Sequence, residues 1–174
     1  MASHKTPVKK SRYQECRELL GISREKASEL LETISPERIE RIETGKYPAY
    51  PEEVLNMAEK YHEPQLCNYY CARECAIGKQ YVPEIEVKHL PQIVLEMLAS
   101  LNSVRNRQER LIDITADGHI TENEITDFVT IQKELERISR TVESLQLWSE
   151  KKIADGEIDL DAYHKALREH ENNN

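Results

Sequence analysis

The sequence predicts an all-α protein, with a bundle of short helices near its N-terminus and a long-helix hairpin near its C-terminus. In the N-terminal third, apolar side chains repeat at helical spacing between capping residues and glycine or proline stops. In the second half, apolar side chains repeat in heptads. The 174-residue chain has only five glycines, one phenylalanine and one tryptophan, a composition that favours helices with modest cores over a sheet enzyme.

Four short helices are predicted in the N-terminal third. Ser23 precedes the second helix and is a good N-cap, because its side-chain oxygen can accept a hydrogen bond from an unpaired backbone amide. Ser35 and Pro36 begin the third helix, with proline at the first helical position, where no amide is needed. Gly45 is the expected left-handed stop, and Pro51 opens the fourth helix. The apolar faces of these helices comprise Ala27, Leu30, Leu31, Ile39, Ile42, Val54, Leu55 and Ala58.

Residues 34–61, ISPERIERIETGKYPAYPEEVLNMAEKY, combine a short turn, a helix ending in Ile-x-x-Ile-Glu-x-Gly-Lys, a proline-bearing loop and a further helix. This segment resembles the third and fourth helices of the Xre/Cro-type helix-turn-helix family of transcriptional regulators, which implies a lambda-repressor-like bundle. One departure is the turn from Leu31 to Ser35, which is longer than the family's compact turn and lacks its glycine. Residues 66–102 and 109–139 look like the C-terminal part of small regulators of this kind from anaerobic Gram-positive bacteria.

The resemblance implies DNA binding, in which the third helix enters the major groove and the second lies across the phosphate backbone. Arginine suits a bidentate contact with guanine, and glutamate can accept a hydrogen bond from cytosine. The outward-facing readers of base edges would be Ser35, Glu37, Arg38 and Arg41. The contacts with phosphates, which position the protein without specifying sequence, would be Ser23, Arg24, Lys26 and Lys46. Glu43 and Arg17 resemble the family's pair that ties the third helix to the first, a structural role.

The alternative is a protein-interaction module whose helix-turn-helix fold no longer binds DNA. Glu37, Glu40 and Glu43 make the third helix acidic, and carboxylates near phosphates are repelled. The distribution of charge favours DNA binding, because residues 1–47 carry 10 Lys or Arg and 8 acidic residues, whereas residues 48–174 carry 14 and 24. The first stretch is net positive in a chain whose net charge is −8.

The basic excess is concentrated in residues 1–12, which are expected to form a flexible arm ahead of the first helix. Its basic side chains are those of His4, Lys5, Lys9, Lys10 and Arg12. Such an arm could follow a DNA groove or backbone. It could equally be a solvated tail or a cloning remnant, because short termini are often disordered.

Two heptad stripes organise the second half of the chain. The first stripe follows Leu90, Ile93, Met97, Leu101, Val104, Gln108 and Leu111. The second stripe follows Phe128, Ile131, Leu135, Ile138, Val142 and Leu145. Helices with such stripes can fold back on each other as an antiparallel hairpin. Further apolar residues widen the stripes and favour a homodimer interface over a purely intramolecular hairpin, namely Val94, Leu98, Ile112 and Trp148.

The predicted organisation follows from these patterns. The basic arm precedes a helix-turn-helix domain over residues 13–63. A cysteine-bearing helix and a linker occupy residues 64–87, and a dimerisation or sensing region occupies residues 88–174. The last region includes a short helix from about residue 160 to residue 170.

The connector between the two heptad helices resembles an EF-hand loop from Asp113 to Glu124. Thr115 occupies the third position, which usually carries a carboxylate or an amide. A second copy of the core of this loop, further along the chain, lacks the calcium ligands at its ends. The favoured interpretation is therefore a helix stop and restart, in which glycine ends one helix and Thr121 or Asp159 caps the next. Calcium binding is the alternative.

Four cysteines, Cys16, Cys67, Cys71 and Cys75, are expected to be thiols in a cytosolic protein. The spacing of four residues places the last three on one helical face, so one zinc ion cannot take all three from an unbroken helix. Buried small apolar side chains are the favoured interpretation. A zinc or iron–sulfur site completed by Cys16 is one alternative, and a redox-sensing thiol is another.

Catalytic and membrane signatures are missing from the sequence. The six histidines form no HExxH pair or triad signature, and there is no glycine-rich phosphate loop. No apolar stretch is long enough to span a membrane, and no signal peptide is recognisable. The expectation is a cytoplasmic protein without enzymatic activity, whose partners are double-stranded DNA and a second copy of itself.

Overall fold

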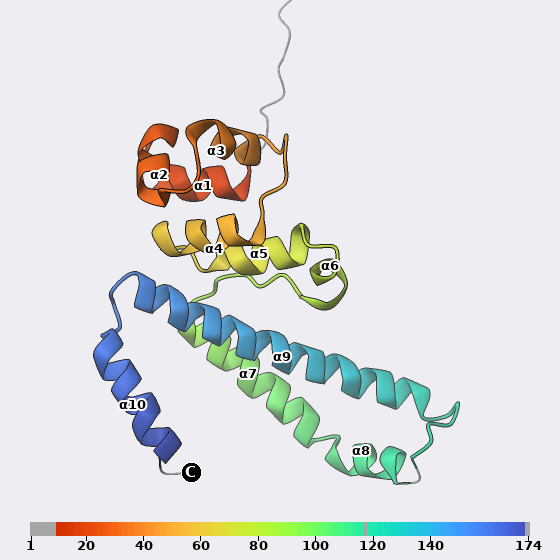
Figure 1. Cartoon of the computed structure of the whole chain (residues 1–174). Helices are drawn as coiled ribbons and strands as arrows, with labels where there is room; N and C mark the ends of the chain where they lie inside the picture. The colour runs from red at the N-terminus through yellow and green to blue at the C-terminus, as the bar shows by residue number, and fades with distance from the viewer. Residues whose placement is uncertain (1–9, 117, 173–174) are drawn as a thin grey trace, which may run out of the picture. The chain divides into compact units, whose positions relative to one another are not determined.

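The structure, a computed structural model, describes residues 10–116 and 118–172, and every regular element in these two stretches is a helix (Figure 1). The all-α prediction is therefore confirmed. In chain order the helices are α1 (Arg12–Leu19), α2 (Arg24–Leu31), α3 (Pro36–Glu43), α4 (Pro51–Lys60), α5 (Gln65–Arg73), α6 (Gly78–Tyr81), α7 (Leu90–Arg105), α8 (Gln108–Thr115), α9 (Ile125–Ala154) and α10 (Leu160–Asn172).

The chain divides into two compact units. The first comprises the chain up to residue 84 together with residues from 151 onward, and the second comprises residues 85–150. The sequence analysis placed residues 88–174 in one region, so the division differs at the C-terminal end. The difference has a local cause, because the Lys151 ammonium group lies 3.2 Å from a Glu63 carboxylate oxygen and donates to the carbonyl oxygen of His62 at 2.9 Å.

Serine caps begin the first three helices. The hydroxyl oxygens of Ser11, Ser23 and Ser35 each accept a hydrogen bond from a backbone amide three residues further on, at 3.3 Å. Pro36 occupies the first turn of α3, and Gly45 follows the helix with a φ of 69°. The predicted starts of α2 and α3, and the predicted left-handed stop after α3, are confirmed.

Helices α1 to α5 bury one apolar core. Its fully buried members are Tyr13, Cys16, Ala27, Leu31, Ile34, Ile39, Ile42, Ala49, Val54, Met57, Ala58, Tyr61 and Leu66. Removing this apolar surface from water is the main favourable contribution to folding of the bundle. Leu55 was expected on the apolar face of α4 but is exposed, because the buried face runs through Val54, Met57 and Ala58 at spacings of three and four.

The turn between α2 and α3 spans residues 32–35 and contains a strained residue. Glu32 has a φ of 59°, a conformation in which an L side chain costs about 1–2 kcal/mol. The Asn56 amide group of α4 donates to the Leu31 carbonyl at 2.8 Å and to the Thr33 hydroxyl at 3.1 Å. Asn56 thus fixes the turn from outside, a role that the sequence pattern did not reveal.

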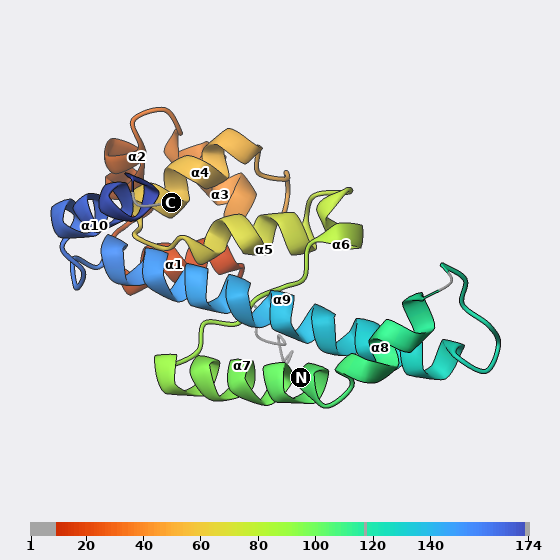
Figure 2. The same cartoon turned by 90° about the horizontal axis from the view of Figure 1, so that it is seen from below.

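Helices α7 and α9 lie side by side in the second unit (Figures 1 and 2). The heptad prediction is correct at Ile93 and Ile131, which are buried. It is wrong at Leu101, Leu135 and Val142, which are exposed, whereas neighbouring hydroxyl residues are buried, namely Ser100 and Thr141. A straight α-helix drifts by about 20° per heptad from a 3.5-residue repeat, so two straight helices do not keep a strict heptad stripe between them. The first stripe is also interrupted, because α7 ends at Arg105.

The two glycine-containing connectors end one helix and begin another, as the sequence predicted. Gly118 and Gly156 have φ values of 74° and 72°. The Asp159 carboxylate accepts a hydrogen bond from the backbone amide of Ala162 at 2.7 Å, which caps α10. Asp117, which belongs to the loop that resembles an EF-hand, lies outside the described residues. Residues 1–9 of the basic arm also lie outside them.

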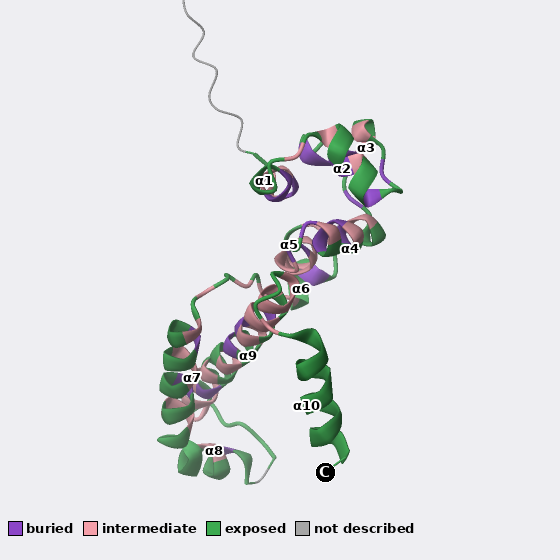
Figure 3. Cartoon of the chain, turned by 90° about the vertical axis from the view of Figure 1, so that its left-hand side faces the viewer, coloured by how far each residue is buried: buried purple, intermediate pink, exposed green. Residues whose placement is uncertain are grey.

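Helix α10 confirms the predicted last helix but buries none of its residues (Figure 3). An apolar stripe of Leu160, Tyr163 and Leu167 runs along it at helical spacing, and all three side chains are exposed. The helix therefore gains little from apolar burial, and its cap, its backbone hydrogen bonds and polar contacts such as that of Lys165 with Glu169 contribute to its stability.

Candidate nucleic-acid interface

A buried carboxylate holds α3 in place. Glu43 accepts hydrogen bonds from Arg17 at 2.5 and 3.1 Å and from Arg24 at 2.8 Å. The side chains of Glu43 and Arg17 are only 1% and 8% exposed, and Arg17 also donates to the carbonyl oxygen of Ile22 at 2.6 Å. The hydrogen bonds with Glu43 raise the pKa of Arg17 despite the opposing effect of burial. The predicted pairing of Arg17 with Glu43 is confirmed.

Arg24, a predicted phosphate contact, pairs with a carboxylate of α3. Its Nε atom donates to Glu43, so its guanidinium group joins α2 to α3 through the same carboxylate that binds Arg17. With two arginines on one carboxylate, the cluster of Arg17, Arg24 and Glu43 carries a net positive charge. It lies where α2 begins and α3 ends. Arg24 therefore contributes to the shape and the charge of this surface while it is held in place.

Arg38 faces α4 and not the solvent, which corrects the expectation of an outward-facing reader. Its guanidinium group donates to both carboxylate oxygens of Glu53 at 2.7 Å and to the carbonyl oxygen of Pro48 at 2.9 Å. It also lies 4.8 Å from the centre of the Tyr50 ring. A bidentate arginine–carboxylate pair of this kind fixes geometry, so Arg38 positions α3 against α4.

The partner of Arg38 serves two helices. Glu53 accepts a hydrogen bond from the backbone amide of Tyr50 at 2.7 Å, which caps the start of α4. Burial acts to raise the pKa of Glu53, but the hydrogen bonds from Arg38 and from the Tyr50 amide outweigh it and lower the pKa. The sequence signal for this role was a glutamate three residues after Tyr50 at a proline-initiated helix start.

Acidic side chains occupy much of the outward face of α3. Glu37 and Glu40 are exposed there, beside Arg41. The pKa of Glu37 is lowered by hydrogen bonds from its own backbone amide and from the Ser35 hydroxyl. Glu25 is held in the same way at the start of α2, by its own amide and Ser23. These carboxylates satisfy helix N-termini, where negative charge is favourable.

The loop after α3 adds two exposed aromatic residues that the sequence analysis did not single out. The Arg41 guanidinium group lies 5.6 Å from the centre of the Tyr47 ring, and the Arg38 guanidinium group lies over the Tyr50 ring. Both tyrosines are exposed, and the Tyr47 amide donates to the Arg41 carbonyl at 3.2 Å. Their signal in the sequence was the pair of tyrosines on either side of Pro48, directly after the glycine stop.

The remaining predicted phosphate contacts lie on the surface. Ser23 caps α2, and the exposed Lys26 ammonium group lies 2.6 Å from the Glu29 carboxylate. Lys46 is exposed directly after Gly45. The exposed basic groups here, Lys26, Arg41 and Lys46, come from α2, α3 and the loop after α3.

The cysteines do not assemble into one site. Cys16 is buried, whereas Cys67, Cys71 and Cys75 are partly exposed. Within residues 10–116 and 118–172, no three or more His, Cys, Asp or Glu side chains are grouped so that they could hold a metal ion. Burial, followed by the nearby Glu63 carboxylate, raises the pKa of Cys16 to about 11, which keeps this thiol protonated and unreactive at neutral pH.

Comparison with known proteins gives no relative for this chain: no protein-family model matches it, and neither a curated protein nor a solved structure is significantly similar. Among the described helices, none has the length and apolar character that crossing a membrane requires. The residues of α2, α3 and the loop after α3 are therefore the basis for inferring what the chain does.

Proposed function

We propose that the chain is a sequence-specific DNA-binding transcriptional regulator with a helix-turn-helix domain in α1 to α4. One observation carries the proposal. Glu43 joins Arg17 of α1 and Arg24 of α2 to the end of α3, so α3 is held rigidly against both helices. A helix that reads base edges must be held in this way, because its side chains must meet the groove in a fixed register.

Arg41 is the proposed reader of base edges. It lies on the outward face of α3, and the edge of guanine in the major groove offers two acceptors that match its fork of donors. Lys46 and Tyr47 are the proposed phosphate contacts beside it, because ammonium and hydroxyl groups donate readily to phosphate oxygens. Lys26 and Ser23 supply the contacts from α2. Arg38 keeps α3 in place and does not read bases.

The test begins with selection of bound fragments from random or genomic DNA, followed by gel shifts over a salt series. Specific binding should weaken linearly in a plot of log affinity against log salt, because phosphate contacts release counterions. Arg41→Gln should cost about 1–3 kcal/mol on the selected site and relax the preference at one base position. Lys133→Gln on α9 makes the same charge change at an exposed position and should leave the preference unchanged.

Two results would contradict this assignment. If Arg41→Gln leaves the preference at every base position intact, Arg41 is not a reader. If the full chain selects no fragment and binds all DNA alike at low salt, the proposed function itself fails.

We also propose that the regulator binds DNA as a homodimer through the second unit. The outward face of α7 carries Leu95, Leu98 and Leu101, which are 68%, 52% and 47% exposed. A row of large apolar side chains in water marks an interaction surface. A second copy is the proposed occupant, because two half-sites bound together multiply a modest affinity per domain.

A second candidate function is a protein-interaction module that no longer binds DNA. The exposed carboxylates of Glu37 and Glu40 on the outward face of α3 favour it, because phosphates repel them. Under this alternative, Glu37→Gln with Glu40→Gln would leave DNA binding absent. Under the DNA-binding proposal, the same double substitution should strengthen nonspecific binding, since it removes repulsion without removing a donor.

A further inference from the structure

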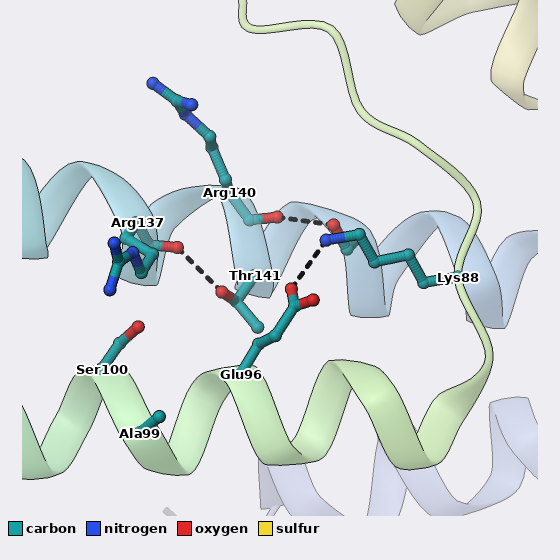
Figure 4. A pocket seen from close by; sticks show the side chains of 8 residues that line it. Lys88, Glu96, Ala99, Ser100, Arg137, Arg140 and Thr141 are labelled. Atoms are coloured by element: carbon teal, nitrogen blue, oxygen red, sulfur yellow. Dashed lines mark hydrogen bonds and ion pairs between the residues drawn. The ribbon is translucent and has the colours of Figure 1, made fainter.

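The second unit contains a polar cavity where a helical hairpin normally has an apolar seam. The cavity lies between α7 and α9 and has a volume of about 350 Å³, within the range of small-molecule sites (Figure 4). Its polar lining comprises Lys88, Glu96, Ser100, Arg137, Arg140, Thr141 and Ser144.

Ser100 is the most unusual group in the lining. Its side chain is fully buried, and its hydroxyl has no hydrogen-bond partner. Thr141 and Ser144 on the facing helix donate to carbonyl oxygens of their own helix at 2.8 Å. Ser100 does not, and its oxygen points toward α9 (Figure 4). A buried hydroxyl without a partner requires an explanation, because leaving it unpaired costs about 1–3 kcal/mol.

The charges around Ser100 favour a negatively charged partner. Glu96 is already neutralised, because it accepts a hydrogen bond from Lys88 at 2.7 Å. The guanidinium group of Arg137 lies near the gap between the helices, 3.5 Å from the Glu134 carboxylate (Figure 4). Arg140 also lines the cavity, 3.9 Å from the Glu136 carboxylate, but its guanidinium group points away from α7 (Figure 4). Neither arginine is in a short ion pair, and Arg137 is the one whose guanidinium group lies near the gap between the helices.

We propose that this cavity binds a small molecule through a carboxylate or phosphate group, with Ser100 as a hydrogen-bond donor and Arg137 as its counter-charge. The Thr141 and Ser144 oxygens retain lone pairs that can accept hydrogen bonds from hydroxyl groups of the same molecule. The site does not depend on DNA binding by the first unit. In a regulator, it would make the second unit the part that senses a metabolite.

The test uses the full chain with two probes, inorganic phosphate for the phosphate group and succinate for the carboxylate, and sodium chloride at matched ionic strength as reference. Isothermal titration and amide chemical shifts near Ser100 report binding. At least one probe should bind with a defined stoichiometry and shift these amides when chloride does not. The probe that binds identifies which of the two groups the site accepts.

Matched variants assign the site. Arg137→Gln should weaken binding by about tenfold or more, because a charge-assisted hydrogen bond is lost. Lys133→Gln removes the same charge one turn earlier on α9, at an exposed residue outside the cavity lining, and should change affinity less than twofold. Ser100→Ala should weaken binding while keeping or raising the thermal midpoint of the free protein, since the unpaired hydroxyl is removed.

Three results would overturn the proposal. The first is that neither probe shifts the amides more than chloride does, which would leave a buried water as the partner of Ser100. The second is equal weakening by Arg137→Gln and Lys133→Gln, which would indicate general charge attraction. The third is unchanged affinity in Ser100→Ala.

Discussion

Glu43 is the residue on which the position of α3 most depends. Its carboxylate is buried and binds two arginines from two other helices. If one partner of a buried pair is removed, the other remains as an uncompensated charge in a low-dielectric environment. The loss of one carboxylate therefore affects α1, α2 and α3 together.

We expect Glu43→Gln to lower the free energy of unfolding by about 3 kcal/mol, because Arg17 keeps its charge and loses its counter-ion. Urea unfolding followed by circular dichroism measures the change. Glu40→Gln on the same helix is the control and should alter the free energy by less than about 0.5 kcal/mol, since Glu40 is exposed. Equal effects of the two substitutions would show that the buried cluster adds no stability.

Glu53 makes stability depend on pH in the acidic range. Its folded-state pKa is below its ordinary value of 4.5, because the hydrogen bonds from Arg38 and Tyr50 outweigh the effect of burial. The folded state therefore stabilises the ionised Glu53 carboxylate more than the unfolded state does. Its contribution to stability is complete above the ordinary pKa and is lost as the pH falls through the lowered pKa.

We expect the difference in unfolding free energy between the natural chain and Glu53→Gln to be constant from pH 7 down to about 5 and then to shrink toward pH 3. Comparing the two proteins at each pH cancels the titration of the other carboxylates. Thermal unfolding in buffers of matched ionic strength provides the measurement. A difference that stays the same down to pH 3 would contradict the lowered pKa.

The sequence was informative for residues whose roles depend on near neighbours. The caps at Ser23 and Ser35 depend on amides three residues away, so local spacing was sufficient to predict them. Arg38 was misassigned because its partner, Glu53, lies 15 residues away on another helix. Helical spacing places Arg38 next to the outward face of α3, and only the packing of α4 shows that a carboxylate meets it there.

At the scale of elements, the junction between α5 and α6 shows how closely two short helices approach. A side-chain carbon added to Gly78 would lie 2.1 Å from the carbonyl oxygen of Cys71, closer than atoms can pack. The neighbouring atom belongs to the backbone and cannot turn away as a flexible side chain could. Glycine is therefore required at this position by proximity and not by its φ angle.

We expect Gly78→Ala to destabilise this junction by about 1–3 kcal/mol, because α6 must move away from α5. Hydrogen exchange should report faster exchange of the amides of Cys75 and Lys79, because Cys75, between the two helices, donates to Tyr70 of α5 and accepts from Lys79 of α6. Gln80→Ala, at an exposed position of α6, is the control and should leave those amides protected. Unchanged exchange in Gly78→Ala would show that the junction is looser than the structure indicates.

The heptad stripes show the limit of prediction for elements. The sequence predicted that the long helices exist and that they pair, and both lie side by side in the second unit. It did not predict which side of each helix faces the other, because Leu101 and the neighbouring Ser100 are equally compatible with a helical stripe. Hydrophobic patterning cannot anticipate a polar cavity, since it assumes that apolar side chains occupy the seam.

At the scale of the whole molecule, the exposed apolar face of α7 and the charge of the chain bear on assembly. A net charge of −8 disfavours nonspecific association, so a dimer requires a specific apolar contact. The row of Leu95, Leu98 and Leu101 offers one. The dimer and the DNA-binding proposals are separable, because the row and α3 lie in different units.

We expect light scattering after gel filtration to give twice the 20.3 kDa mass of the chain. The double substitution Leu98→Glu with Leu101→Glu should give the single-chain mass with unchanged helix content, because it places two charges in the contact. Leu55→Glu, at an exposed position of α4 in the first unit, is the matched control and should remain dimeric. A natural chain that elutes as a monomer at micromolar concentration would exclude the homodimer.

The exposed helix α10 has a thermodynamic consequence. Since it buries no residue, its 13 residues gain little from apolar packing, and a helix of this length is marginal in water without such packing. Its helix content should therefore decline gradually with temperature and take no part in the cooperative melting of the bundle. A complete helix of 13 residues is thus expected to lie outside the cooperative unfolding transition of the chain.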